Sequence, residues 1–398
     1  MSASVQLQGS FPLPPARRQD KVHLGYLDGL RACAAILVVL HHIWYTIWPY
    51  WGPRPPVWTQ WLGLGHANVD VFMVLSGFCL MLPVVRGDGT LRGGTRAFFK
   101  KRARRILPPY YSALALSLFF IWTVAGRPTN TLWDISLPVT ARGVIVHLLL
   151  LQDFTAKYIS QINYALWSIS LEWWIYFLFP ALVLAWNRFG GGVTTAFSVA
   201  GTWLLCRTLD HFLAQSFTLQ YIALFVFGML GAEIVHGHRT PLRFLRDRLP
   251  WEAVTWIAAG LALLAFQGKI PYFVLTERSD LLIGFWAMCL LITLGLRPSL
   301  RLARTLSQKS AVFLGSFAYS IYLIHPPLVQ LIWQSGLRPL HLAPVPAFLL
   351  LVLGGTPLIV AAAYLFHLAF ERPFMTRPGV KIKTEAQAES VAVVNPAP

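Results

Sequence analysis

The sequence predicts an all-α, polytopic transmembrane helical bundle of about ten spans, with the N- and C-termini in the cytoplasm. Apolar residues make up 56% of the 398 residues and charged residues only 12%, whereas a soluble domain carries about twice that charged fraction. Several apolar runs approach the ~20 residues that a helix needs to cross a bilayer. The runs are continuous rather than alternating, which argues against a barrel and for helices, the other fold that satisfies its backbone in lipid.

Ten apolar stretches are long enough to be considered as spans. A further apolar piece, residues 143–151, is too short to cross and is expected to be interfacial or re-entrant. The expected spans are 26–48, 66–85, 106–126, 166–187, 192–209, 217–235, 251–268, 279–296, 312–334 and 345–369.

The distribution of lysine and arginine supports this count. Residues 86–105 hold eight basic side chains and one acid, and residues 236–248, residues 297–309 and the tail after Glu371 are also basic. Ten spans with an internal N-terminus place all four segments on the cytoplasmic side, where short loops accumulate positive charge. Nine or eleven spans would put the basic C-terminal tail outside.

The net charge of +17 therefore reflects membrane topology, and no nucleic-acid partner is expected. The four cysteines stand alone in apolar runs without metal-ligand spacing, so no metal site is expected either. The chain divides into a retained cytoplasmic tail (1–25), a transmembrane domain (26–375) and a tail expected to be disordered (376–398).

Ionisable residues at membrane depth are costly and are usually functional. Arg31 and His42 in the first span are eleven residues apart, which is three helical turns plus about 20° and roughly 16 Å of rise. They share one face, whereas His41 points elsewhere, and Asp28 can pair with Arg31. An imidazole suits general-base chemistry on a hydroxyl. A satisfied interfacial histidine beside a snorkelling arginine is an equal alternative.

Further candidates lie at the starts of later spans. Asp70 in the second span is expected to orient His42 or hold substrate hydroxyls, with a helix-entry acid as the alternative. The neighbouring Ser76 and Gly77 are interpreted as close helix packing. Arg102 and Arg105 share a face at the cytoplasmic mouth of the third span, where a fork of guanidinium groups suits phosphate.

Glu172 lies in a strongly apolar stretch of the fourth span, and packing alone gives no reason to bury it there. Ser168 and Ser170 precede it, and Ser170 is a candidate substrate-binding residue. Late in the chain, Tyr322 and His325 share a face and are further substrate-binding candidates. A packing histidine at a proline kink is the alternative for His325.

Taken in order, these segments resemble the acyltransferase 3 family of integral membrane proteins. The chain departs from the common pattern at Trp173, where many members have a polar residue, and at Pro326, where many have tryptophan. The resembling segments are Tyr26–His42, Val69–Phe78, Arg102–Pro108, Trp167–Glu172 with Tyr176, Leu314–His325 and residues 370–373.

The resemblance implies a multi-pass enzyme of the bacterial cytoplasmic membrane, so that residues 26–375 form a transmembrane acyltransferase domain. It would take an acyl group, expected to be acetyl, from cytoplasmic acyl-CoA and pass it to a hydroxyl of a sugar or glycan. In that family, the histidine matching His42 is regarded as catalytic and the arginine matching Arg31 as essential. The pair matching Arg102 and Arg105 is associated with the donor.

Three other functions stay open from the sequence. One is a transporter or flippase that uses buried Arg31, His42 and Glu172, and another is a scaffold in which these charges only pack. The third is acylation of a small-molecule natural product. The leading hypothesis is O-acyl transfer, with His42 as base or acyl carrier and with Asp70 or Glu172 orienting it. The oligomeric state is not predicted.

Overall fold

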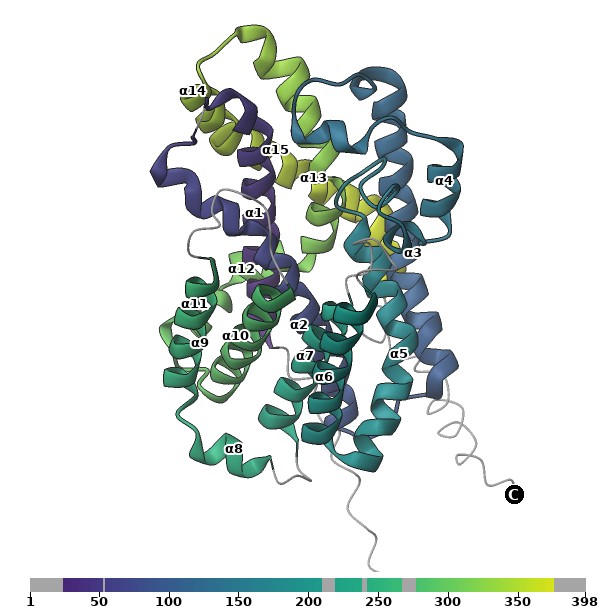
Figure 1. The fold of residues 1–398 in the computed structure, drawn as a ribbon, viewed down its shortest axis with the longest axis vertical. Coiled ribbons are helices and arrows are strands. Elements are labelled where there is room, and N and C mark those ends of the chain that lie inside the picture. Colours follow the sequence, from purple (N-terminus) through teal and green to yellow (C-terminus); the bar gives the residue numbers. More distant parts are fainter. Residues whose placement is uncertain (1–23, 53, 210–218, 238–241, 267–276, 376–398) are drawn as a thin grey trace, which may run out of the picture.

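The computed structural model describes residues 24–52, 54–209, 219–237, 242–266 and 277–375. These residues form an all-helical bundle, and no β-strand occurs within the described ranges. Figure 1 shows the bundle with α14 near one end of its long axis, α8 at the other, and α4 at the side of the half that holds α14. The expected C-terminal tail, most of the expected N-terminal tail, residues 217–218 and residues 267–268 lie outside the described residues.

The bounds of the elements follow the apolar stretches closely. The long helices are α1 (Gly25–Ile47), α2 (Ala67–Val85), α3 (Gly94–Phe120), α5 (Trp167–Phe189), α6 (Gly191–Leu209), α7 (Gln220–His236), α9 (Trp251–Phe266), α10 (Glu277–Leu296) and α13 (Ala318–Leu331). The shorter ones are α4 (Ala141–Leu148), α8 (Arg243–Arg248), α11 (Arg301–Leu306), α12 (Lys309–Ser316), α14 (Pro344–Leu350) and α15 (Thr356–Phe366). Turns of 3-10 or π-helix join or extend them, among them η2 (Val57–His66), η6 (Ile332–Leu337), η8 (Leu351–Gly355) and η9 (His367–Glu371).

Six helices among the described residues are long and apolar enough to cross a membrane, and a bent pair raises the number to seven. Each of the ten expected stretches is mostly helical where the structure describes it, with a break at Phe317 inside the ninth. The count of ten and the cytoplasmic location of the termini stay predictions. The six are Gly25–Tyr50, Val57–Val85, Gly94–Ala125, Trp167–Phe189, Ser279–Leu296 and Pro344–Phe374.

Helix α2 lies at the centre of the bundle, in contact with α1, α7 and α10. Its closest approach is to α7, where Gly77 of α2 and Gly228 of α7 face the partner's backbone. A Cβ atom on Gly77 would collide with the carbonyl of Phe225, and one on Gly228 with the carbonyl of Val74. Small residues let membrane helices approach closely, so the packing role predicted for Gly77 is confirmed.

Helices α12 and α13 form the bent pair, with an angle of 65° between them. The break lies at Phe317, which separates the two helices. Pro326 and Pro327 lie inside α13, which continues through them. The sharp bend of the ninth expected span is therefore at Phe317 rather than at the prolines, and α13 is placed against α1, α3 and α15.

The short apolar piece after the third span forms α4. Its eight residues rise only about 12 Å, too little to cross a bilayer. Thr140 caps the helix by accepting from the Gly143 N–H, and the Tyr110 hydroxyl donates to the His147 carbonyl at 2.9 Å. The prediction that this piece does not span is confirmed.

Candidate active site

Helix α1 directs its two adjacent histidines to different neighbours. His41 is buried, and its Nδ1 lies 2.7 Å from the Leu62 carbonyl of η2. His42 faces α13, where its Nδ1 lies 2.8 Å from Nε2 of His325. The structure thus separates the two rings as the helical geometry predicts, and it brings together His42 and His325.

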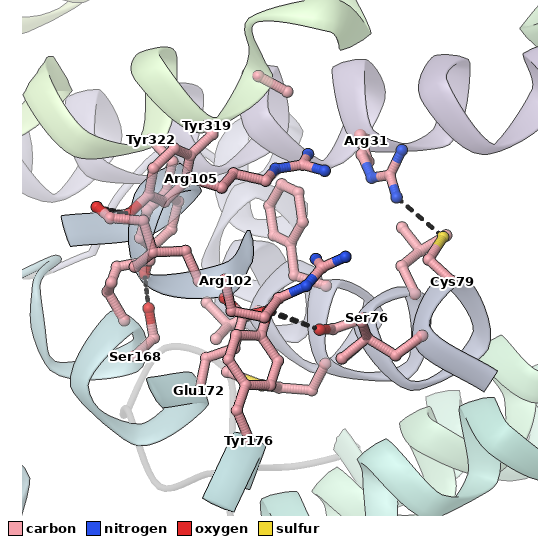
Figure 2. Close-up of a pocket in the computed structure, with 18 of the residues that line it drawn as sticks. Arg31, Ser76, Cys79, Arg102, Arg105, Ser168, Glu172, Tyr176, Tyr319 and Tyr322 are labelled. Atoms are coloured by element: carbon pink, nitrogen blue, oxygen red, sulfur yellow. Dashed lines mark hydrogen bonds between the residues drawn. The ribbon is translucent and has the colours of Figure 1, made fainter. Parts of the chain in front are cut away.

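A cavity of about 220 Å³ lies among α1, α2, α3, α5 and α13. Its polar lining includes Arg31 of α1, Arg102 and Arg105 of α3, and Glu172 of α5. Figure 2 shows the three guanidinium groups reaching toward the same space from two different helices. These four residues come from three separate segments of the sequence and share one cavity, the arginine pocket.

The arginines of this pocket differ in how far the protein satisfies them. Arg31 donates from Nη1 to the Asp28 carboxylate at 2.6 Å and from Nη2 to the Cys79 sulfur at 2.8 Å. The Nε of Arg102 is buried and has no hydrogen-bond partner among the described residues, while Arg105 is exposed. A buried N–H without an acceptor is costly, so the pocket suits an anionic ligand.

Glu172 is held by two hydroxyl groups inside the same pocket. The Ser76 hydroxyl of α2 and the Tyr176 hydroxyl of α5 each donate to its Oε1 at 2.5 Å. The negative charge of Glu172 faces the arginines rather than His42, and electrostatic attraction links it to Arg102. Glu172 thus forms part of the wall of the arginine pocket.

The two serines before Glu172 point to opposite sides of α5, because residues two apart differ by about 200°. Ser170 is buried and donates to the Leu150 carbonyl at 2.6 Å, so its hydroxyl faces packing and not the pocket. Ser168 lines the pocket and lies 2.7 Å from the Tyr322 hydroxyl. Ser168 rather than Ser170 therefore lines the pocket, and the substrate-binding role of Ser170 stays a prediction.

Asp70 lies away from both histidines of the predicted site. Its fully buried side chain is next to Tyr221 of α7 and Asp280 of α10. Asp70 does not line the pocket, although Val69, Phe72 and Met73 of the same helix do. The partner that holds the His42 ring is His325, and neither Asp70 nor Glu172 occupies that position.

The prolines that follow His325 explain how its ring is held. A proline has no N–H, so Pro326 and Pro327 cannot donate to the carbonyls four residues earlier in α13. Those carbonyls belong to Tyr322 and Leu323. The Tyr322 carbonyl lies 2.8 Å from Nδ1 of His325, and the Leu323 carbonyl accepts from the Asn163 amide at 3.0 Å.

Tyr164 and Tyr322 complete the surroundings of the histidine pair. The Tyr164 ring lies 4.8 Å from the His42 ring, and burial raises the pKa of Tyr164, so it stays a neutral phenol. The Tyr322 ring lies 5.8 Å from His325 and also lines the arginine pocket. One layer of side chains, Phe72, Ser168 and Tyr322, therefore separates the pocket from the histidines.

Several site residues were not predicted. Ser76 was interpreted as packing, yet it lines the pocket and binds Glu172. Tyr319 and the buried Glu371 also line it, and Glu371 accepts from Ser320 at 2.6 Å. A sequence signal existed only for the α5 wall, because Ser168, Glu172 and Tyr176 follow an i, i+4, i+8 pattern. Within the described part of the chain, no three His, Cys, Asp or Glu side chains are grouped to hold a metal ion.

The chain is similar in sequence to several curated bacterial proteins. The chain is 24% identical over 334 residues to O-acetyltransferase OatA of Staphylococcus aureus, a match that covers 77% of this chain and 51% of the relative. It is 24% identical over 351 residues to the putative peptidoglycan O-acetyltransferase YrhL of Bacillus subtilis, covering 79% and 50%. It is 23% identical over 273 residues to nodulation protein 10 of Rhizobium leguminosarum, covering 62% and 70%.

The chain spans about half the length of the first two of these relatives, and no solved structure matches it significantly. The sequence model of the acyltransferase domain, type 3, matches residues 24–367. This range contains both the arginine pocket, apart from Glu371, and the histidine pair. The chain therefore belongs to the acyltransferase 3 family.

Proposed function

We propose that this membrane protein transfers an acyl group, with acetyl the expected one, from cytoplasmic acyl-CoA to a hydroxyl of a sugar or glycan. One observation carries the proposal: Arg31, Arg102 and Arg105 meet in one pocket, and α1 continues from Arg31 to a hydrogen-bonded His42. The names of the relatives from S. aureus and B. subtilis describe O-acetyl transfer. The side of the membrane follows from the basic loops, which would face the cytoplasm.

The pocket would hold the donor in part only. Ligand pockets measure roughly 300–1,000 Å³, and this cavity of about 220 Å³ is small for a whole acyl-CoA. We place the phosphates at the mouth, near exposed Arg105 and the unpaired Nε of Arg102. Guanidinium groups bind phosphate through paired hydrogen bonds. The thin pantetheine arm then occupies the cavity.

The length of α1 explains why a long arm is needed. Arg31 and His42 are separated by roughly 16 Å of helix, so one compact group cannot contact both. The layer of Phe72, Ser168 and Tyr322 lies between them. The arm must part the Ser168–Tyr322 hydrogen bond, 2.7 Å long, to bring the thioester to His42.

In the proposed reaction, the His42 imidazole acts as a general base or as an acyl carrier. Nε2 of His42 takes the proton of the acceptor hydroxyl, and the hydroxyl oxygen attacks the thioester carbonyl carbon. The C–S bond breaks, an ester forms, and the CoA thiolate receives the proton. In the covalent variant, Nε2 of His42 attacks the thioester carbonyl carbon and the C–S bond breaks to release the CoA thiolate. The acceptor hydroxyl then attacks the acyl-imidazole carbon, the ester forms, and the released imidazole takes the hydroxyl proton. The acceptor then approaches from the side opposite the basic loops.

The test uses the full chain in nanodiscs with radiolabelled acetyl-CoA and isolated membrane glycans. We expect label in the glycan fraction for the wild type and a loss of at least about 100-fold for His42→Ala, since general-base groups contribute about 10²–10⁴-fold. His147→Gln serves as a matched histidine control because His147 lies in α4. Acyl transfer by His42→Ala at the wild-type rate would contradict the proposal.

Transport is the second function under test, and the same preparation separates it from acyl transfer. Liposomes with the reconstituted chain are loaded with the glycan and assayed for flux and for label. Glycan flux in the absence of acetyl-CoA, without label, would support a flippase.

A further inference from the structure

We infer that His325 is a positioning residue that acts through His42: it fixes the tautomer of His42 in which Nε2 carries the free lone pair. This inference rests on the proposed function, because it assigns the atom of His42 that reacts. It also differs from the sequence expectation, in which His325 touches the substrate.

The Tyr322 carbonyl determines which nitrogen of His325 carries the proton. A carbonyl oxygen only accepts hydrogen bonds, so Nδ1 of His325, 2.8 Å away, must carry its proton and donate. Pro326 contributes no backbone N–H to this carbonyl, and a carbonyl at membrane depth needs an internal donor. The His-Pro order therefore favours this single arrangement of the His325 ring.

The tautomer of His325 in turn determines the tautomer of His42. A neutral imidazole has one N–H, so the Nε2 of His325 is an acceptor once Nδ1 donates. The 2.8 Å contact with Nδ1 of His42 must then be a hydrogen bond that His42 donates. The neutral His42 ring therefore has its proton on Nδ1 and its lone pair on Nε2, the atom available as base or nucleophile.

A neutral partner suits this position. When His42 takes a proton, its Nδ1–H becomes a charged donor, and hydrogen bonds from charged donors are shorter and stronger. His325 can accept that bond without bringing a permanent charge into the membrane, which a carboxylate would do at considerable cost. The ring centroids are 4.9 Å apart and the ring planes 29° apart, so the two rings lie edge to edge, as an in-plane N–H···N hydrogen bond requires.

Two amide substitutions distinguish positioning from other roles. In His325→Gln, the side-chain amide reaches the place of Nε2 and can still accept from His42. In His325→Asn, the shorter amide reaches only the place of Nδ1, near the Tyr322 carbonyl, and removes the acceptor that α13 offers to His42. We expect His325→Gln to retain at least a tenth of the wild-type kcat. His325→Asn should lower kcat by about 100-fold, the lower end of general-base effects.

The binding of the donor provides the second readout. His325 does not line the arginine pocket, so both variants should bind CoA with the wild-type Kd, measured calorimetrically on nanodiscs. Nitrogen-15 NMR of labelled histidine should show the Nδ1–H tautomer for His42 in the wild type and in His325→Gln, and a mixture in His325→Asn. Thermal melting of each variant confirms that it is folded.

The outcomes separate this inference from the proposed function. Equal kcat values for the Gln and Asn variants, or a wild-type tautomer in His325→Asn, overturn the positioning role of His325. A changed Kd for CoA with an unchanged kcat would overturn it too, in favour of ligand contact. An active His42→Ala, in contrast, overturns the proposed function itself.

Discussion

Replacement of Arg102 by glutamine tests how the pocket holds its ligand. The buried Nε of Arg102 has no partner in the described part of the chain, so its hydrogen bond to a phosphate would be gained only when the donor binds. A hydrogen bond that involves a charged group contributes about 1.5–3 kcal/mol. At about 1.4 kcal/mol per factor of ten, Arg102→Gln should raise the Kd for CoA roughly 10- to 150-fold.

Calorimetric titration of CoA into the chain in nanodiscs measures this Kd without any acceptor. Arg104→Gln is the matched control, since Arg104 is exposed, lies on the same helix and does not line the pocket. It should change the Kd by about twofold at most, because an exposed charge is screened by solvent and salt. Equal losses in both variants would refute a specific Arg102 contact and leave only the general positive charge of the loop.

Three further predictions follow from packing and burial. Ser170→Ala should cost about 1 kcal/mol of stability through its lost bond to Leu150, with acyl transfer unchanged, as melting and transfer assays would reveal. Gly77→Val should force α2 and α7 apart. This overpacking should lower the free energy of unfolding by about 1–3 kcal/mol, which a lower melting temperature would show. Burial lowers the pKa of His147 to about 4, so the unfolded chain alone takes up that proton between about pH 6.5 and 4. The free energy of unfolding should therefore decrease as the pH is lowered through that window, and it should decrease less in His147→Gln.

Much of the fold could be predicted because hydropathy is a local property. Each expected stretch is mostly helical where described, and the short piece at α4 does not span. The 65° break at Phe317 was not predicted, although the Gly315-Ser316 pair directly precedes it and such pairs are common at kinks. It depends on how α12 and α13 pack against α1, and such contacts are tertiary.

The site was predicted as far as a single helix can specify it. The face shared by Arg31 and His42, and the fork of Arg102 and Arg105, follow from residue spacing alone. The rotation of one helix against another does not, and for this reason Asp70 was expected beside His42. A sequence cannot state which of two serines on opposite faces, Ser168 or Ser170, meets a neighbouring helix.

Two prolines, Pro326 and Pro327, directly follow His325 inside α13. The first of them, Pro326, stands where many members of the family have tryptophan. The structure gives them a physical consequence, since each leaves a carbonyl of α13 without its backbone donor. His325 satisfies one carbonyl and Asn163 the other. A proline pair at membrane depth thus requires side-chain donors, and a histidine directly before it can supply one. If the His42–His325 pair is the centre of the reaction, the backbone of α13 decides which nitrogen of His42 reacts.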